Sequence, residues 1–340
     1  MGSQSEIPPR RRRIYRVTSL GHPEVSRTRK AVRRAKKFLT WDGWLKLGAI
    51  AGAIGVLAGL FFSVQSLLAN SKQYRIAERA EFTTTFGKAI EQIGSINLDT
   101  RLGGIYLLER LAQDSVRDRP TILHILSAYV REHTARLDVC NTEFSTAYPP
   151  TDVQAVLTVI GRRSGDDPVD LSSTCLTGAN WTNAKLVNVN LDFAILPYSR
   201  FNNATFDRHG IRGANFYRSQ FAYADLEGST IEYSTLEKAS LDGANLNGAR
   251  FSDDVMSGCD LSRASLVRGR IIESDISNCN LLRTNLKDAE LRNSNLKGTR
   301  FDWPKPPAPA LNLSTAKFDN VQYDATTIWP SGFQPPPHQS

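Results

Sequence analysis

The stretch SLDGANLNGARF, residues 240–251, places Leu241, Leu246 and Phe251 five residues apart with only small or polar residues between them. An α-helix turns about 100° per residue, so side chains five apart scatter around its axis and share no buried face. In a β-strand an odd spacing sends successive side chains to opposite faces. A period of five therefore fits neither regular element and predicts a chain that turns at every repeat.

This period extends far beyond the quoted stretch. Every fifth residue from Leu171 to Phe301 is Leu, Ile, Phe, Trp or Met, which gives 27 positions, and the residue two before each is usually small. A chain that turns by about 90° per repeat closes a square coil, points the apolar and the small residue inward, and pairs successive coils as parallel strands about 4.8 Å apart. Residues twenty apart should then stack in columns, such as Leu171, Leu191, Ile211, Ile231, Phe251, Ile271 and Leu291.

The frequent turns need Gly and Asn, and GANLNGARF (243–251) and NAKLVNVNL (183–191) supply them. This consensus resembles the pentapeptide-repeat family, and the resemblance covers residues 171–301. It implies a right-handed quadrilateral β-helix, for which we predict bounds of 164–301. The segment 83–133, with its sequence LDTRLGGIYLLERLAQDS, resembles the helical region that precedes the repeats in membrane-anchored, actinobacterial-type members. Membership by itself implies little about function.

The beginning of the chain has a different character. Residues 1–46 hold 13 Lys or Arg against three acidic residues, whereas 47–71 carry no charge and are long enough to cross a hydrocarbon core of about 30 Å. We predict a basic, mostly disordered cytoplasmic tail over 1–43 and one transmembrane helix over 44–70. The excess of Lys and Arg before this helix predicts a cytoplasmic N-terminus and a C-terminal domain outside the cytoplasm, with a cytoplasmic domain as the alternative.

Two features beside the predicted span are candidate contact sites. The basic run sets topology and could also contact anionic lipid head groups; its members are Arg29, Lys30, Arg33, Arg34, Lys36 and Lys37. Glycines recur inside the span at intervals of four, three and four and share one helix face; they are Gly48, Gly52, Gly55 and Gly59. Such a stripe permits close helix contact and hence a homodimer, and the alternative is a glycine-rich span without a partner.

Helical periodicity follows the span. Leu102, Ile105 and Leu108 share one face of a predicted helix, and Thr151 can cap a later one. We therefore predict a helical region over 71–163. After Phe301 the five-residue register fails, so 302–340 should form a Pro-rich loop, a cap that contains Trp329 and a disordered tail.

A few inward positions break the pattern of small residues. His209 should distort a corner, and Asp254 could be satisfied by the hydroxyls of Ser234 and Ser274, which favours a structural over a catalytic role. Cysteines occupy related positions: Cys259 and Cys279 should stack as free thiols, whereas Cys140 and Cys175 could form a disulfide if the domain is exported.

Three classes of function can be compared. The rod could be a membrane-tethered scaffold that binds another protein, with outward Tyr198, Tyr217, Tyr223 and Tyr233 as candidate contact residues or as ordinary surface. The resemblance also offers a DNA mimic that acts on gyrase, but residues 171–301 hold 15 basic and 14 acidic residues, a net charge of +1, and such a mimic should be strongly acidic. An enzyme is least supported, since no P-loop, dinucleotide motif, metal cluster or nucleophile elbow occurs. We predict no catalytic residue, cofactor, metal ion or nucleic-acid partner.

Overall fold

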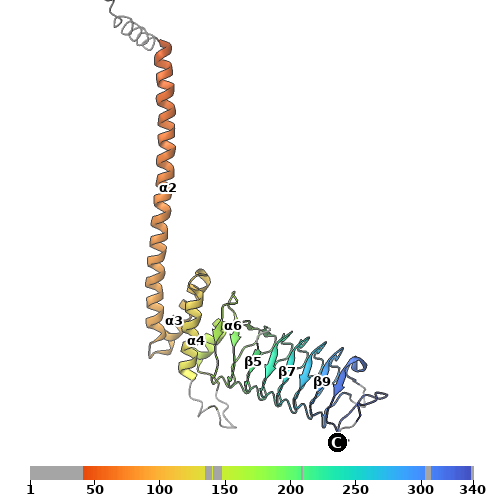
Figure 1. Cartoon of the computed structure of the whole chain (residues 1–340). Coiled ribbons are helices and arrows are strands. Elements are labelled where there is room, and N and C mark those ends of the chain that lie inside the picture. Colours follow the sequence, from red (N-terminus) through yellow and green to blue (C-terminus); the bar gives the residue numbers. More distant parts are fainter. Residues whose placement is uncertain (1–40, 135–139, 141–147, 208–209, 303–307, 338–340) are drawn as a thin grey trace, which may run out of the picture. The chain divides into compact units, whose positions relative to one another are not determined.

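A computed structural model describes residues 41–134, 140, 148–207, 210–302 and 308–337 of the chain, with only the backbone of 41–43 (Figure 1). The helices and strands are α2 (Trp41–Ile93), α3 (Leu98–Asp114), α4 (Arg119–Thr134), α6 (Thr151–Gly161), β1 (Val169–Asp170), β2 (Lys185–Leu186), β3 (Val189–Asn190), β4 (Thr205–Phe206), β5 (Gly210–Arg212), β6 (Thr230–Glu232), β7 (Arg250–Ser252), β8 (Arg270–Ile272), β9 (Glu290–Arg292), the 3₁₀ helix η1 (Leu313–Thr315) and β10 (Lys317–Asp319).

The long helix α2 contains the predicted membrane span and continues without a break to Ile93. It is long and apolar enough to cross a membrane by length and composition. The apolar side chains of its first half are exposed, among them Leu57 and Phe62. Residues 1–79 and 80–340 form two separate compact units. His209 and all six residues of the candidate lipid-contact run lie outside the described residues.

The helices after α2 pack around a buried apolar face. Ile105 and Leu108 of α3 and Ile122 of α4 are fully buried, which confirms the predicted helical periodicity. Gly104 allows α3 to approach the end of α2, because a Cβ there would lie 2.7 Å from the backbone nitrogen of Ile93. The capping prediction for Thr151 is wrong: it is the first residue of α6, and the N-cap is Pro150, which offers no side-chain hydrogen bond.

The repeats form a four-sided parallel solenoid of about six turns, as the period of five predicted. Strands β5 to β10 lie side by side in one sheet (Figure 1), and Ile211, Ile231 and Phe251 are register partners twenty residues apart. Parallel bridges with the same twenty-residue offset form the other three sides as far as residue 300, and the offset increases to 26–28 residues in the last bridge of each side. Corner residues adopt left-handed φ angles near +55° to +70°, where Gly and Asn are frequent.

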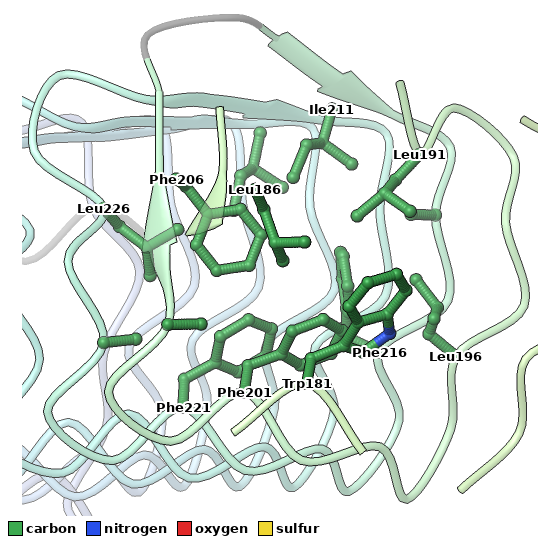
Figure 2. Packing of buried hydrophobic residues seen from close by; sticks show 14 of the residues in the cluster. Trp181, Leu186, Leu191, Leu196, Phe201, Phe206, Ile211, Phe216, Phe221 and Leu226 are labelled. Carbon is green, nitrogen blue, oxygen red and sulfur yellow. The ribbon is translucent and has the colours of Figure 1, made fainter. Parts of the chain in front are cut away.

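The interior of the solenoid is filled by the predicted apolar columns. Figure 2 shows Trp181, Phe201 and Phe221 stacked along one column, with ring centroids 6.5 Å and 4.8 Å apart and planes within 10° of parallel. Leu246 and the other residues of the five-residue register are buried as well. Burial of each large side chain contributes about 1.5 to 3 kcal/mol, so these columns are the main source of the rod's stability.

Polar contacts fix the helices to the first coil. Helix α4 packs on β1, and α6 packs on β2. The buried Arg163, just after α6, donates to the carbonyls of Ile160, Lys185 and Val187, and thereby joins the helix end to the first coil. Gln154 of α6 exchanges two hydrogen bonds of 2.9 Å with the backbone of Asn180. The helices thus cover the otherwise open first edge of the solenoid.

The far end of the rod is closed by residues after the Pro-rich insertion. Phe318 of β10 pairs with Leu291 at an offset of 27 residues, so the register resumes after an insertion of seven. Trp329 stacks on Phe301 at 4.5 Å and on Phe333 at 5.2 Å. Trp329 therefore lies against the last apolar column, where a cap was expected.

The four cysteines form two pairs. Cys140 is joined to Cys175 with a Cα–Cα distance of 5.9 Å, as hypothesised. Cys259 is joined to Cys279 with a Cα–Cα distance of 4.6 Å, so the expectation of free thiols was wrong. The spacing of coils explains the second pair, because equivalent inward positions of successive coils lie within disulfide reach.

Candidate functional site

The four candidate tyrosines lie at three corners of the solenoid. Tyr198 and Tyr217 lie at one corner in successive coils, and Tyr233 lies at the corner on the other edge of the adjoining side. Tyr223 lies at the next corner along the chain. Three of the four candidates therefore share one surface, and the fourth does not.

Tyr198 and Tyr217 are in direct contact. Their rings meet edge to face with centroids 5.8 Å apart. Two cations approach the Tyr217 ring, the Arg218 guanidinium at 5.3 Å and the Lys238 ammonium at 5.4 Å. The Lys238 ammonium also pairs with Glu237 at 2.7 Å, and this hydrogen bond raises the pKa of Lys238. The pair of rings is thus held in place by cation–π contacts and still reaches solvent.

The opposite corner adds an aromatic residue that the sequence reasoning missed. Phe193 lies two coils before Tyr233 in the same corner column, and both have left-handed φ angles and exposed side chains. Arg212 lies over the Tyr233 ring at 4.9 Å, and the Phe193 ring lies against Gly213, whose missing Cβ would be 2.6 Å from it. The signal was present in the sequence, since 193 and 233 differ by two complete coils.

We name this surface the aromatic face and define it by Phe193, Ile195, Tyr198, Tyr217 and Tyr233. Its first edge is the corner formed in successive coils by residues 192–193, 212–213, 232–233, 252–253 and 272–273. Its second edge is the corner formed by residues 197–198, 217–218, 237–238, 257–258 and 277–278. Phe193 is 58% exposed, Tyr233 54% and Tyr198 38%. Aromatic rings that are exposed together on one side of a rod are typical of a contact surface.

The same side is already covered in the first coil by the chain itself. Cys140 is bonded to Cys175, which occupies the column of Ile195, and its sulfur lies 3.6 Å from the hydroxyl of Thr177. Tyr148 lies against Gly178, which occupies the column of Tyr198. This side of the solenoid is therefore covered by the chain itself in the first coil and is exposed in the following coils, where it forms the aromatic face.

Tyr223 has a different environment. Its ring lies against Gly243 one coil further on, and a Cβ at Gly243 would be 2.6 Å from the ring. Arg263, which forms an ion pair with Asp242, lies close enough to Tyr223 for an electrostatic interaction. Tyr223 therefore packs on the rod as an isolated ring, away from the aromatic face.

Asp254 is a titratable group inside the solenoid. Its Oδ1 accepts a 2.7 Å hydrogen bond from the backbone nitrogen of Ser234, whereas its buried Oδ2 has no hydrogen-bond partner. The predicted hydroxyl contacts are absent, because Ser234 and Ser274 donate their hydroxyl protons to the carbonyls of Glu232 and Ile272. Burial raises the pKa of Asp254 to about 8, against the smaller opposing effect of backbone hydrogen bonds.

The predicted helix-dimer stripe is open in the structure. Nothing lies within 4 Å of a Cβ built at the stripe glycines Gly48, Gly52, Gly55 and Gly59. Among the residues that the structure describes, no group of three or more His, Cys, Asp or Glu is placed to hold a metal ion.

Comparison with known proteins places the repeats in a family. The model of pentapeptide repeats matches in 8 copies, over residues 169–203, 234–269 and 270–303. A comparison with curated proteins found no match.

Solved structures that resemble this chain have low sequence identity to it. They include QnrB1, a plasmid-mediated fluoroquinolone resistance protein (15% identity, 45% of this chain and 84% of that chain covered, TM-score 0.38). They also include HetL from the cyanobacterium Nostoc sp. strain PCC 7120 (21% identity, 48% and 90% covered, TM-score 0.21) and Rfr23 from the cyanobacterium Cyanothece 51142 (19% identity, 47% and 91% covered, TM-score 0.20). The matched residues, 169–203 and 234–303, lie in the coils of the solenoid, so this part of the chain consists of pentapeptide repeats.

Proposed function

We propose that this chain is a membrane-tethered scaffold that binds another protein through the aromatic face and catalyses no reaction itself. The observation that carries the proposal is the contact between Tyr198 and Tyr217, flanked by Phe193 and Tyr233 on one side of the solenoid. Tyrosine offers a large contact area at a low cost in side-chain entropy, and aromatic residues are enriched in the cores of protein interfaces.

The interior of the rod supports a scaffold more than an enzyme. The inward positions are occupied by the chain's own side chains, stacked as Figure 2 shows. A substrate site normally needs a concave pocket with converging polar groups. The outward positions offer flat sides, which suit docking of a folded partner.

We propose that α2 is the helix that anchors the chain in the membrane. Its uncharged stretch 47–71 is exposed and matches the thickness of a bilayer. The positive-inside rule would put the basic tail in the cytoplasm, beside anionic lipids, and the solenoid outside it. The Cys140–Cys175 disulfide fits an oxidising compartment.

Affinity capture with full-length protein tests the contact surface. The tagged wild type is compared with Tyr217→Ala and with Tyr223→Ala, which removes a more exposed tyrosine from another corner. We expect a protein that wild type and Tyr223→Ala retain equally and that Tyr217→Ala retains about tenfold less, as for loss of an interface anchor. Equal retention by all three chains would refute the proposed contact surface.

A protease-accessibility measurement tests the tether and its direction. A tag after residue 340 should remain with the membrane after alkaline carbonate extraction. It should also be removed by protease added to cells whose outer layers have been opened and whose cytoplasmic membrane is intact. Release of the protein by carbonate would refute the tether, and a protected tag would place the solenoid in the cytoplasm.

A further inference from the structure

We propose that the aromatic face is occupied by a second copy of this chain, with the two solenoids side by side and parallel, related by a two-fold axis along the rods. This inference rests on the proposed function, which requires only that some protein binds the face. It adds the identity of the partner and the direction in which it lies.

The two edges of the aromatic face have opposite charge. The first edge carries four acidic residues and one basic residue, a net charge of −3; the acidic residues are Asp192, Glu232, Asp253 and Glu273, and the basic one is Arg212. The second edge carries Arg218 and Lys238 against Glu237, a net charge of +1. Most of these side chains are half-buried or exposed, so their charges can act on a partner.

Symmetry decides which edges meet. A two-fold axis along the rods places the first edge of one copy against the second edge of the other at the same coil level. A two-fold axis across the rods places each edge against itself, so acidic residues face acidic residues. Charge complementarity therefore favours the parallel pair.

The parallel arrangement also brings the apolar parts together. Because it preserves the coil level, the edge with Tyr198 and Tyr217 in one copy meets the edge with Phe193 and Tyr233 in the other, so the exposed rings of the two copies face each other. Lys238 of one copy lies near the level of Tyr233 and Asp253 of the other.

Cysteine cross-linking of the full-length protein in membranes provides the test. Thr235, at the centre of the face, and Thr230, on the adjacent side of the same coil, are each replaced by Cys and treated with a short bis-maleimide. Parent protein without the added cysteine gives the background. We expect at least about tenfold more cross-linked dimer from Thr235→Cys than from Thr230→Cys, since a residue near the axis faces its own copy. Equal yields, or no dimer at Thr235→Cys, would overturn the proposal.

Charge reversal in the Thr235→Cys background tests the direction of packing. Lys238→Glu and Asp253→Lys should each reduce cross-linking by roughly tenfold, because each puts like charges together at both contacts of the pair. A mixture of the two variants should recover the yield as a heterodimer. An antiparallel pair predicts no loss for Lys238→Glu, and that outcome would overturn the parallel arrangement.

The same variants separate this inference from the proposed function. If Thr235→Cys yields no dimer while Tyr217→Ala still loses a captured protein, the second copy is excluded and the contact surface stands. If Tyr217→Ala reduces neither the amount of captured protein nor the yield of cross-linked dimer, both the proposed function and this inference fail.

Discussion

Asp254 is a carboxyl group that the solenoid buries with only one of its oxygens paired. Its neighbours in the column are serines whose hydroxyls bind backbone carbonyls, so the Oδ2 atom gains no donor. Asp253 and Glu232 add unfavourable negative charge nearby. The protonated acid is therefore the form that fits the interior at neutral pH.

Stability should fall as the pH rises because of this residue. The pKa of Asp254 is about 8 in the folded protein and close to about 4 in an unfolded chain, so between these values the folded state alone holds the proton. The stabilisation that comes from this bound proton is fully present below about pH 4 and is lost as the pH rises through about 8. We expect urea unfolding to show this decline in the wild type and a smaller decline in Asp254→Asn. Equal slopes for the two proteins would contradict the assignment.

Glycine at a corner is required where an aromatic ring lies against it. Gly243 and Gly248 both have left-handed φ angles, but a Cβ at Gly243 would meet the Tyr223 ring at 2.6 Å, whereas a Cβ at Gly248 would meet nothing within 4 Å. Gly248→Ala should therefore cost about 1 kcal/mol for backbone conformation alone, and Gly243→Ala about 2 kcal/mol or more.

A double variant checks the cause of that difference. In a Tyr223→Ala background, Gly243→Ala should cost no more than Gly248→Ala, because the ring has been removed. Thermal unfolding of the four proteins gives the comparison. An unchanged cost of Gly243→Ala in that background would show that the ring contact is not its origin.

At the level of elements, a buried polar network joins three helices ahead of the repeats. Asp152 of α6 accepts hydrogen bonds of 2.7 Å from Arg101 of α3 and from Tyr129 of α4. Burial alone would raise the pKa of Asp152, but these hydrogen bonds outweigh it and lower the pKa. The same carboxylate raises the pKa of Tyr129, with burial as the larger cause.

Removal of this carboxylate should lower the free energy of unfolding of the helical region. Asp152→Ala leaves Arg101 and the Tyr129 hydroxyl without their partner and should cost about 2 to 4 kcal/mol. The control is Asp114→Ala, which breaks an exposed pair with Arg110 at 3.8 Å and should cost less than about 0.5 kcal/mol. The free energy of unfolding from urea titration provides the measurement. Similar costs for the two variants would refute a supporting role for the network.

The period of five predicted the elements of the rod because stacking depends only on which residues lie twenty apart. That rule placed Phe251 between Ile231 and Ile271, and the structure confirms it. The rule did not predict the contact between Tyr198 and Tyr217, since these residues are nineteen apart and meet at one corner through the directions of their two side chains. Contacts of Asp254 were also mispredicted, because the serine hydroxyls had backbone carbonyls closer at hand.

At the level of the whole molecule, each coil depends on its neighbours and both ends of the solenoid are covered. Helices pack on the first coil, and Trp329 and Phe333 lie beyond the last apolar column. Covered ends disfavour growth through strand pairing. A partner is therefore expected on a side of the rod, and the aromatic face is the side with the largest group of exposed rings that we describe.

Photo-cross-linking in intact membranes can show whether a partner binds the aromatic face. A photoreactive phenylalanine analogue is placed at position 217 in the full-length chain, and at position 223 in a matched control. The proposal predicts a discrete cross-linked protein adduct from position 217, at the mass of a dimer if the partner is a second copy, and little or none from position 223. No adduct from position 217, or equal adducts from both positions, would contradict it.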